Sequence, residues 1–543
     1  MATSATLAGG RFDRQSATDT PSRTVALAVA TIAVVAAFTR VRAFAGRRSL
    51  WFDEAAVAMN IVQRSFSDLL LPLDHEQTAA PLFLWGERIA YLVGGNNEWA
   101  LRALPLIAGL LLPFAMWSVA KRLLPPIEAL IAVAFISLSP FLIYYANEVK
   151  PYGIDALVTA LLFAAALRVQ ERPEERRRWI ALALGGALAI GFSIPAPLVL
   201  AGVGVYLLAQ RAVRTAPNAI ANGAITLAAW GVAALLAFLV YRPVMSHQSF
   251  IGSFMQHYWG STFLTTEPPG LKERALTAVA AATRTTFLDG VMWPQQTNLI
   301  LVIAIAGLAR ITRTRGVAAA APLVIPLGLL VTLAALRMYP LGDRVILFAA
   351  PITALLLVAG FTWPAQLFRG QWQSRAITLA GALVLAIPVS RAFSSGRLPP
   401  FRAETRALIQ ELNRARHTAK PAPVVWLSAG SVMAWRYYAG PMEPPEIEVR
   451  PGAPLPQPDS IAPGILVGKW PQSAEAKAKP DWGLWELQRI RAAGAECGYM
   501  LLSVLEPEER EKLVDAIHRS GTRIATTHKA QGAEMFRVCF PAA

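Results

Sequence analysis

The stretch VALAVATIAVVAAF, residues 25–38, contains no charged side chain and is the first of many such runs in this chain. A helix needs about 20 apolar residues to cross the hydrocarbon core of a bilayer. Segments of roughly 16 to 24 residues with almost no charge recur along the first 395 positions. We count about eleven of them, centred near Ile32, Ala108, Ala134, Leu162, Ala187, Val205, Ala233, Ile303, Leu329, Leu355 and Leu383. The pattern predicts a polytopic α-helical membrane protein.

The composition of the whole chain supports this class. Of the 543 residues, 55% are apolar and 16% are charged, and the mean hydropathy is +0.42. Soluble domains carry about 25% charged residues, and disordered chains are poorer in apolar residues. The composition therefore excludes both a soluble enzyme and a disordered chain.

The formal charge of +16 is better explained by membrane topology than by a role in nucleic-acid binding. Basic residues gather in short loops on alternate sides of the predicted helices, as in Lys121-Arg122 and Arg176-Arg177-Arg178. The positive-inside rule places these loops in the cytoplasm, so we predict no nucleic-acid partner. Four arginines after the first apolar run do not fit this rule, and we expect them to be interfacial or to face an anionic ligand: Arg40, Arg42, Arg47 and Arg48.

The topology divides the chain into three parts in a cytoplasmic (inner) membrane. Residues 1–23 are predicted to be a cytoplasmic tail, and residues 24–396 a multi-pass transmembrane domain with extracytoplasmic loops at about 46–100 and 242–298. Residues 397–543 are predicted to be an extracytoplasmic soluble domain. Ala43-Phe44-Ala45 resembles a processing site, so a cleaved signal peptide is the alternative to the retained signal-anchor that we expect.

The C-terminal part has the pattern of a small α/β domain. Leu408, Ile409 and Leu412 have helical spacing, and the run 424–427 resembles a short buried strand. Further strands are predicted at 465–468 and 499–502, and an amphipathic helix at 507–520. The two cysteines, Cys497 and Cys539, both lie here, and either a disulfide or two unpaired thiols fits the sequence.

Three polar segments fall on the predicted extracytoplasmic side. Charged groups beside a bilayer are costly, so those that persist usually face a cavity, a substrate or a partner charge. The first segment holds Asp53 and Glu54, before a predicted surface helix at 55–71, and continues through the patch 73–80 to a helix beginning at Pro81. The second runs from Tyr144 to Asp155, and the third from Arg337 to Arg344. We expect carboxylates and cations to converge on one face.

Two of these segments resemble the paired signatures of a known family. Leu50-Trp51-Phe52-Asp53-Glu54-Ala55 and Ala146-Asn147-Glu148-Val149-Lys150-Pro151-Tyr152 are similar to the motifs of bacterial GT-C glycosyltransferases of the protein mannosyltransferase-like type (glycosyltransferase family 39). The segments 77–85 and 339–351 resemble further family segments, so the likeness extends to about residue 360. Lys150 stands where the family more often has arginine, and the stretch between His75 and Pro81 resembles an insertion.

The resemblance implies transfer of a sugar from a polyprenyl-phosphate-linked donor to an extracytoplasmic acceptor, which is a lipid, glycan or protein, with inversion. It implies that Asp53 is the general base, that Glu54 orients the acceptor or a metal, and that Glu148 is a second carboxylate. The remaining predicted roles are donor phosphate binding by Lys150, Arg344 and Tyr152, and an acceptor or substrate loop with His75, Gln77 and Tyr339. A divalent cation, magnesium or manganese, is possible, with Asp53 and Glu148 as candidate ligands.

Each assignment has a structural alternative. Asp53 and Glu54 fit a helix cap, Glu148 and Lys150 fit an interfacial ion pair, and Arg344 fits a snorkelling side chain. His75 with Glu76 is a weak metal pair and fits a solvated loop better. Two other classes of protein also fit, a transporter or a non-catalytic membrane scaffold that presents the C-terminal domain. The external clustering of charge and the lack of internal repeats argue against a transporter.

Overall fold

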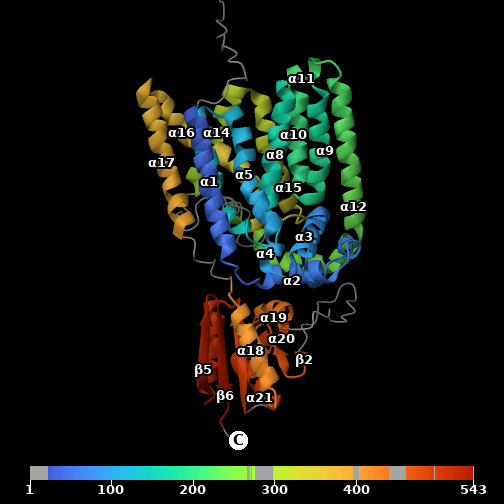
Figure 1. Cartoon of the computed structure of the whole chain (residues 1–543), viewed down its shortest axis with the longest axis vertical. Helices are drawn as coiled ribbons and strands as arrows, with labels where there is room; N and C mark the ends of the chain where they lie inside the picture. Colours follow the sequence, from blue (N-terminus) through green and yellow to red (C-terminus); the bar gives the residue numbers. More distant parts are fainter. Residues whose placement is uncertain are drawn as a thin grey trace, which may run out of the picture.

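The computed structural model describes residues 23–265, 270, 272–274, 297–394, 403–439, 460–471, 473–494 and 496–541. These residues form a helical domain and a smaller α/β domain that lies against one end of the helices (Figure 1). The predicted tail up to residue 22, much of the predicted long loop and the junction near residue 397 lie outside the described residues.

Each of the predicted apolar centres lies inside a helix of the helical domain. These helices are α1 (Arg23–Ala45), α5 (Ala103–Leu123), α6 (Pro126–Leu138), α8 (Tyr152–Glu171), α9 (Arg176–Phe192), α10 (Ala196–Ala209), α12 (Ala219–Tyr258), α14 (Thr297–Arg315), α15 (Ala321–Ala335), α16 (Ala350–Thr362) and α17 (Gln371–Ser394). Among the described residues, six helical stretches are long and apolar enough to cross a membrane. A polytopic helical membrane architecture is therefore confirmed, whereas the number of spans stays a prediction.

The helical domain carries its apolar surface outward as well as inward. Large apolar side chains such as Leu27, Leu184 and Ile220 are more than half exposed on α1, α9 and α12. Lipid tails solvate such surface, so close packing rather than burial from water must hold the helices together. Gly307 and Gly360 illustrate this, because a Cβ on either would collide with a backbone carbonyl across the α14–α16 contact.

The first loop folds into short helices at one end of the helical domain (Figure 1). They are α2 (Phe52–Gln63), α3 (Pro81–Gly94) and α4 (Glu98–Leu101), with 3-10 turns at Asp68–Leu70 and Asp74–Glu76. Pro81 begins α3 as expected, since proline suits the first turn of a helix. The surface helix predicted at 55–71 is wrong in its bounds, because α2 already begins at Phe52 and ends at Gln63.

Helix α12 continues to Tyr258 and therefore passes Arg242, where the second extracytoplasmic loop was predicted to begin. Two short helices complete the helical domain, α7 (Pro140–Tyr145) and α11 (Arg211–Thr215). Further 3-10 turns lie at Gly260–Thr262, Val317–Ala320, Asp343–Ala349 and Trp363–Leu367.

The C-terminal domain is built on a six-stranded mixed sheet of order β2-β3-β1-β4-β6-β5. Its strands are β1 (Val424–Leu427), β2 (Ser460–Ala462), β3 (Ile465–Val467), β4 (Cys497–Ser503), β5 (Arg523–Ala530) and β6 (Ala533–Cys539). Its helices are α18 (Arg406–Thr418), α19 (Val432–Tyr438), α20 (Ala474–Lys477), α21 (Trp482–Ala492) and α22 (Pro507–Arg519). A 3-10 turn lies at Ala429–Ser431.

Strand β1 explains why both faces of this sheet are covered. All four of its residues are buried, and it pairs in parallel with β3 and β4. Val425 and Leu427 pack with the core on the α18 and α19 side, whereas Val424 and Trp426 pack with that of α21 and α22. Alternation along one strand thus divides the domain into two apolar layers.

Cys497 and Cys539 form a disulfide in the structure. They stand opposite each other where β4 pairs with β6 in antiparallel register. Of the two alternatives that the sequence allows, the structure therefore has the bridge.

The structure places the four exceptional arginines in different environments, and Arg42 is exposed. Arg40 is fully buried, and its Nη1 donates to the carbonyl oxygens of Ala36 (3.1 Å) and Ser137 (2.7 Å). This corrects the expectation that Arg40 is interfacial or faces a ligand. Arg47 pairs with Glu98, and the guanidinium of Arg48 lies 4.6 Å from the ring centre of Tyr144.

Candidate active site at the first loop

Asp53 is the centre of a cluster of charged side chains at the end of the helical domain. It lies in the first turn of α2, and its side chain is 13% exposed. Lys150 Nζ lies 2.8 Å from Asp53 Oδ1, and Arg344 Nη2 lies 2.9 Å from Asp53 Oδ2. One carboxylate thus bridges two cations that are far apart in the sequence.

Each cation is delivered by a short connection rather than by a long helix. Lys150 lies between α7 and α8, where Pro151 precedes the first helical residue of α8. Arg344 lies in the 3-10 turn Asp343–Ala349, which leads into α16. Gln77 joins from the first loop, and its Oε1 accepts a hydrogen bond of 2.7 Å from Lys150 Nζ. Three polar segments therefore meet at Asp53, as the sequence predicts.

Aromatic rings surround the guanidinium of Arg344. Its Cζ lies 5.6 Å from the ring centre of Trp51, 5.9 Å from that of Tyr152 and 5.5 Å from that of Trp259. Arg344 Nε also donates to the hydroxyl oxygen of Tyr152 at 3.2 Å. Rings at these distances attract the cation and help to hold it in place.

The charge of Lys150 depends on its surroundings. Burial lowers the pKa of Lys150 below its ordinary value, although Asp53 opposes this effect. Desolvation penalises the charged form of an amine, whereas a nearby carboxylate favours it. The positive charge of Lys150 is therefore maintained by the negative charges around it.

Glu54 points into a different set of contacts from its neighbour Asp53. Its two oxygens accept hydrogen bonds from Arg102 Nε at 2.9 Å and Arg102 Nη2 at 2.7 Å. The backbone amide of Val149 donates to Glu54 Oε1 at 2.9 Å. Because Glu54 is only 2% exposed, these contacts join α2 to the second signature segment. The predicted role of Glu54 toward an acceptor or metal stays a prediction.

Glu148 is fully buried beside the cluster. Its Oε1 accepts a hydrogen bond of 3.2 Å from the indole nitrogen of Trp51. The electrostatic field of Glu148 also favours the charged form of Lys150. Glu148 therefore links the two signature segments and adds negative charge beside Lys150.

Two other predicted residues contribute less directly. The hydroxyl of Tyr339 donates to the carbonyl of Val345 at 2.8 Å, which braces the segment that carries Arg344. His75 has a positive φ of 60°, and its carbonyl accepts from Gln77 Nε2. Burial and the charge of Arg436 lower the pKa of His75 to about 4, so its ring is neutral at neutral pH. The side chain of Glu76 lies outside the described part of the chain.

The contacts of these side chains bear on the alternatives that the sequence left open. Asp53 and Glu54 both lie in the first turn of α2, so their carboxylates also fit a favourable interaction with the N-terminus of this helix. Trp51 is the N-cap residue of α2, and no side-chain cap bond is made there. Lys150 and Arg344 both form ion pairs with Asp53, and the charge of Glu148 also acts on Lys150.

A divalent cation does not fit this arrangement. Asp53 already faces two positive side chains, which would repel a metal ion at the same oxygens. The described residues contain no group of three or more His, Cys, Asp or Glu side chains placed to hold a metal ion.

Two residues of the site carry no signal in the sequence. Arg102 is a single arginine before an apolar helix, and Trp259 follows α12 in the region predicted to be a long loop. Their roles depend on contacts with Glu54 and Arg344, which are distant in the chain. Only the tertiary structure reveals them.

These features define the class as a polytopic helical membrane protein with a buried carboxylate–cation cluster at one end of its helices. Residues 78–247, less than half of the chain, match the model of the family described as dolichyl-phosphate-mannose-protein mannosyltransferase. The resemblance to GT-C glycosyltransferases is thereby confirmed. The matched range includes Glu148, Lys150 and Tyr152, and it leaves out Asp53 and Arg344.

Several solved structures are similar to this chain at low sequence identity. ArnT from Cupriavidus metallidurans bound to undecaprenyl phosphate is 12% identical, with coverage of 95% of this chain and 98% of that one and a TM-score of 0.49. Archaeal oligosaccharyltransferase AglB from Archaeoglobus fulgidus, with an inhibitory peptide and a dolichol-phosphate, is 11% identical, with coverages of 94% and 74% and a TM-score of 0.46. Arabinofuranosyltransferase AftD from mycobacteria is 17% identical, with coverages of 96% and 40% and a TM-score of 0.44. A sequence comparison with curated proteins finds no significant match.

Proposed function

We propose that this protein transfers a sugar from a polyprenyl-phosphate-linked donor to an acceptor outside the cytoplasmic membrane. The observation that carries the proposal is the position of Asp53 between Lys150 and Arg344. A carboxylate beside two cations supplies both requirements of the reaction, a base for the acceptor and positive charge for a leaving phosphate. The matching family is named for a dolichyl-phosphate sugar donor, which supports a lipid phosphate as the leaving group.

The reaction is a single displacement with inversion at the anomeric carbon of the sugar. The acceptor hydroxyl loses its proton to Asp53, and its oxygen forms a bond to the anomeric carbon. The bond from that carbon to the phosphate oxygen breaks, and the electron pair stays on the phosphate. Proton, sugar and charge are thus all accounted for without a further reactant.

Lys150 and Arg344 act on the charge that develops during this step. The donor phosphate competes with Asp53 for both cations when it binds, which releases the Asp53 carboxylate toward the acceptor. Fixed cations in a site shielded by aromatic rings stabilise developing charge more strongly than water does. Tyr152 holds Arg344 through its hydroxyl, and Gln77 holds Lys150.

Glu54 and Glu148 are positioning residues in this proposal. Glu54 is held by Arg102 and ties α2 to Val149, next to Lys150. Glu148 holds the ring of Trp51, which in turn lies near Arg344. His75 and Tyr339 stay candidates for the acceptor side of the site.

The site and the C-terminal domain are proposed to lie on the extracytoplasmic side of the inner membrane. The first loop and the C-terminal domain lie at the same end of the helical domain (Figure 1), which supports a shared compartment. The distribution of basic loops supports the extracytoplasmic side for that compartment.

The substitution Asp53→Asn tests the proposal because it keeps the shape of the side chain and removes its basicity. The measurement is transfer of labelled sugar in membranes supplied with a polyprenyl-phosphate sugar. We expect transfer to fall by about a hundredfold or more. Asp68→Asn is the matched control, since Asp68 is an exposed acid of the same loop whose carboxylate accepts a hydrogen bond from Ser65. Unchanged transfer by a folded Asp53→Asn variant would overturn the assignment.

A further inference from the structure

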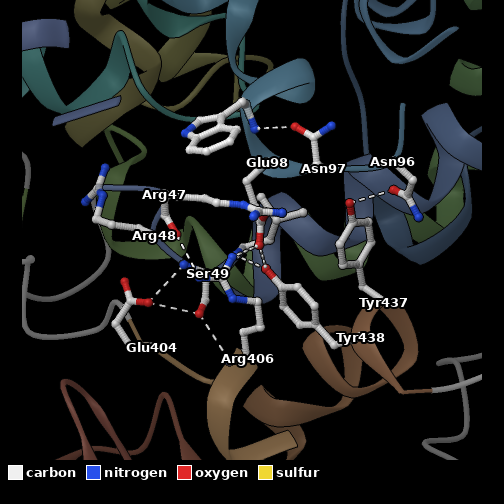
Figure 2. Close-up of polar contacts among 12 residues, drawn as sticks. Arg47, Arg48, Ser49, Asn96, Asn97, Glu98, Glu404, Arg406, Tyr437 and Tyr438 are labelled. Carbon is white, nitrogen blue, oxygen red and sulfur yellow. Dashed lines mark hydrogen bonds and ion pairs between the residues drawn. The ribbon is translucent and has the colours of Figure 1, made fainter. Parts of the chain in front are cut away.

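The C-terminal domain forms hydrogen bonds with residues 47–50, which precede α2, the helix that carries Asp53. Residues 47–50 are neither helix nor strand, and Asp53 follows three positions later. Figure 2 shows Arg47, Arg48 and Ser49 of this segment near Glu98 of the same loop and near Glu404, Arg406 and Tyr438 of the C-terminal domain. We call this contact the interdomain clasp.

The clasp satisfies backbone groups that have no partner in regular secondary structure. The amide and hydroxyl of Ser49 both donate to Glu404 Oε2, each at 2.9 Å. The amide of Leu50 donates to the hydroxyl oxygen of Tyr438 at 2.7 Å. The carbonyl of Arg47 accepts from Arg406 Nη2 at 3.2 Å (Figure 2). Ser49 and Leu50 are buried, and a buried backbone amide without a partner is strongly disfavoured. The conformation of this segment therefore depends on the C-terminal domain.

Glu98 completes the clasp from the first loop. It is 2% exposed, and it accepts from Arg47 Nε at 2.9 Å, Arg406 Nη1 at 2.6 Å and the hydroxyl of Tyr438 at 2.9 Å. The hydroxyl of Tyr438 thus donates to Glu98 while it accepts from the Leu50 amide. One oxygen atom of the C-terminal domain joins both parts of the first loop.

The opposite side of the same segment is bonded to the residues of the site. Arg102 donates to the carbonyl oxygens of Arg48 (2.7 Å) and Ser49 (3.2 Å) as well as to Glu54. Helix α19 also packs against α2, and Tyr437 belongs to the same buried apolar cluster as the core of α2. Residues 47–50 are therefore held from both sides immediately before Asp53.

We propose that the C-terminal domain positions the catalytic base, with Glu404 and Tyr438 as positioning residues for Asp53. This inference rests on the proposed function. Neither residue contacts the cluster around Asp53 in the described structure; both act through the backbone of residues 49 and 50. A displacement of about 1 Å at a catalytic group lowers the rate about a hundredfold, so a looser segment reduces turnover more than it reduces donor binding.

Three variants of the full-length protein test this inference. Glu404→Ala removes the acceptor for Ser49, Glu404→Gln keeps an acceptor oxygen, and Tyr438→Phe removes one hydroxyl while it keeps the ring. Glu508→Ala, an exposed residue of α22, is the matched control. Sugar transfer is measured as kcat and KM per folded molecule, with folding checked by thermal unfolding.

We expect kcat to fall about tenfold in Glu404→Ala and Tyr438→Phe with less than a twofold change in the KM of the donor, because these residues hold the base and not the donor. Glu404→Gln recovers most of the loss, and Glu508→Ala changes nothing. If Glu404→Ala does not fold, Tyr438→Phe, which loses a single atom, decides the question.

A kcat within twofold of the wild type in a folded Tyr438→Phe variant overturns the inference. A different result would contradict the proposed function itself, namely that Asp53→Asn keeps its transfer activity. The same amide of Leu50 gives an independent readout, because its hydrogen exchange accelerates in Tyr438→Phe only if the clasp restrains this segment.

Discussion

Two carboxylates of the first loop, Asp53 and Glu98, each bridge a pair of cations and yet differ in what surrounds them. Asp53 binds Lys150 and Arg344 at 2.8 and 2.9 Å, and Glu98 binds Arg47 and Arg406 at 2.9 and 2.6 Å. The side chain of Asp53 is 13% exposed, whereas that of Glu98 is 2% exposed. Charge and distance alone do not separate the two clusters.

The surroundings separate them. Lys150 and Arg344, which pair with Asp53, both come from the helical domain, and three aromatic rings lie near Arg344. The partners of Glu98 come from two domains, and a tyrosine hydroxyl supplies a third hydrogen bond. An acid that remains partly accessible among fixed cations suits chemistry, whereas an acid whose oxygens are saturated by two domains suits assembly.

The largest effect is expected at the cations of the Asp53 cluster. Arg344→Ala removes a guanidinium held by Asp53 and Tyr152, and loss of one group that stabilises developing charge costs about a hundredfold in kcat. Sugar transfer measured in membranes tests this. Arg211→Ala, on an exposed part of α11 at the other end of the helices (Figure 1), is the control. Equal losses in both variants would contradict a special role for Arg344.

Glu54, the acid next to Asp53, sharpens the comparison because its substitution should lower the stability of the protein more than the rate of sugar transfer. Glu54→Gln weakens a buried pair with Arg102, whose side chains are 3% and 5% exposed, and breaking such a pair costs about 3 kcal/mol. Thermal unfolding of the purified protein measures this loss. Transfer per folded molecule should fall much less than in Asp53→Asn; the reverse order would make Glu54 the base.

Glu98→Gln should destabilise the protein by a smaller amount, about 1 to 2 kcal/mol, because Arg47 and Arg406 keep partial access to water. Burial opposes the charge of Glu98, but hydrogen bonds from its own backbone amide and Tyr438 and the charge of Arg406 outweigh it and lower the pKa of Glu98.

A lowered pKa gives this contribution a defined pH dependence. The stabilisation is present above the pKa of glutamate in the unfolded chain and is lost as the pH falls through the lower pKa of the folded state. Unfolding temperatures of the wild type and Glu98→Gln should therefore converge in acid. A gap of constant size at every pH would show that the charge of Glu98 is not what stabilises the clasp.

Lys150→Arg should change the pH profile more than the rate at neutral pH. Burial lowers the pKa of Lys150, so its positive charge is lost at a lower pH than that of an ordinary lysine, and transfer should decline on the alkaline side. Arginine keeps its charge throughout this range, so the alkaline decline should move to higher pH in the variant. An unchanged profile would mean that another group titrates there.

The smallest effect is expected at His75. Because burial and Arg436 lower the pKa of His75 to about 4, its ring does not change charge between pH 5 and 8. His75→Asn should leave the shape of the pH profile over this range unchanged, measured by the same transfer assay. Loss of an inflection near the ordinary histidine pKa of about 6.5 would contradict this.

The apolar segments and their approximate centres follow from composition along the chain. A bilayer requires a long apolar helix at each crossing whatever the rest of the fold, so each of the predicted centres falls inside a helix. Strand β1 and the helix around Leu408 follow from local spacing for a different reason, because apolar residues that face a core repeat with the period of a helix or form a short run in a buried strand. The bounds of α2 and the extent of α12 do not, because packing at the ends of helices decides where they stop.

The residues at the site were identifiable in the sequence, whereas their partners were not. Asp53, Glu148, Lys150 and Arg344 stand out because charge beside a bilayer is rare and because two short segments resemble family signatures. The pairing of cations with carboxylates is decided only in the folded chain, where Lys150 forms an ion pair with Asp53 and Arg102 forms one with Glu54. The burial of Arg40 and the clasp around Glu98 likewise join segments far apart in the chain. Local sequence determines which helices enter the membrane, and long-range packing determines which charges meet.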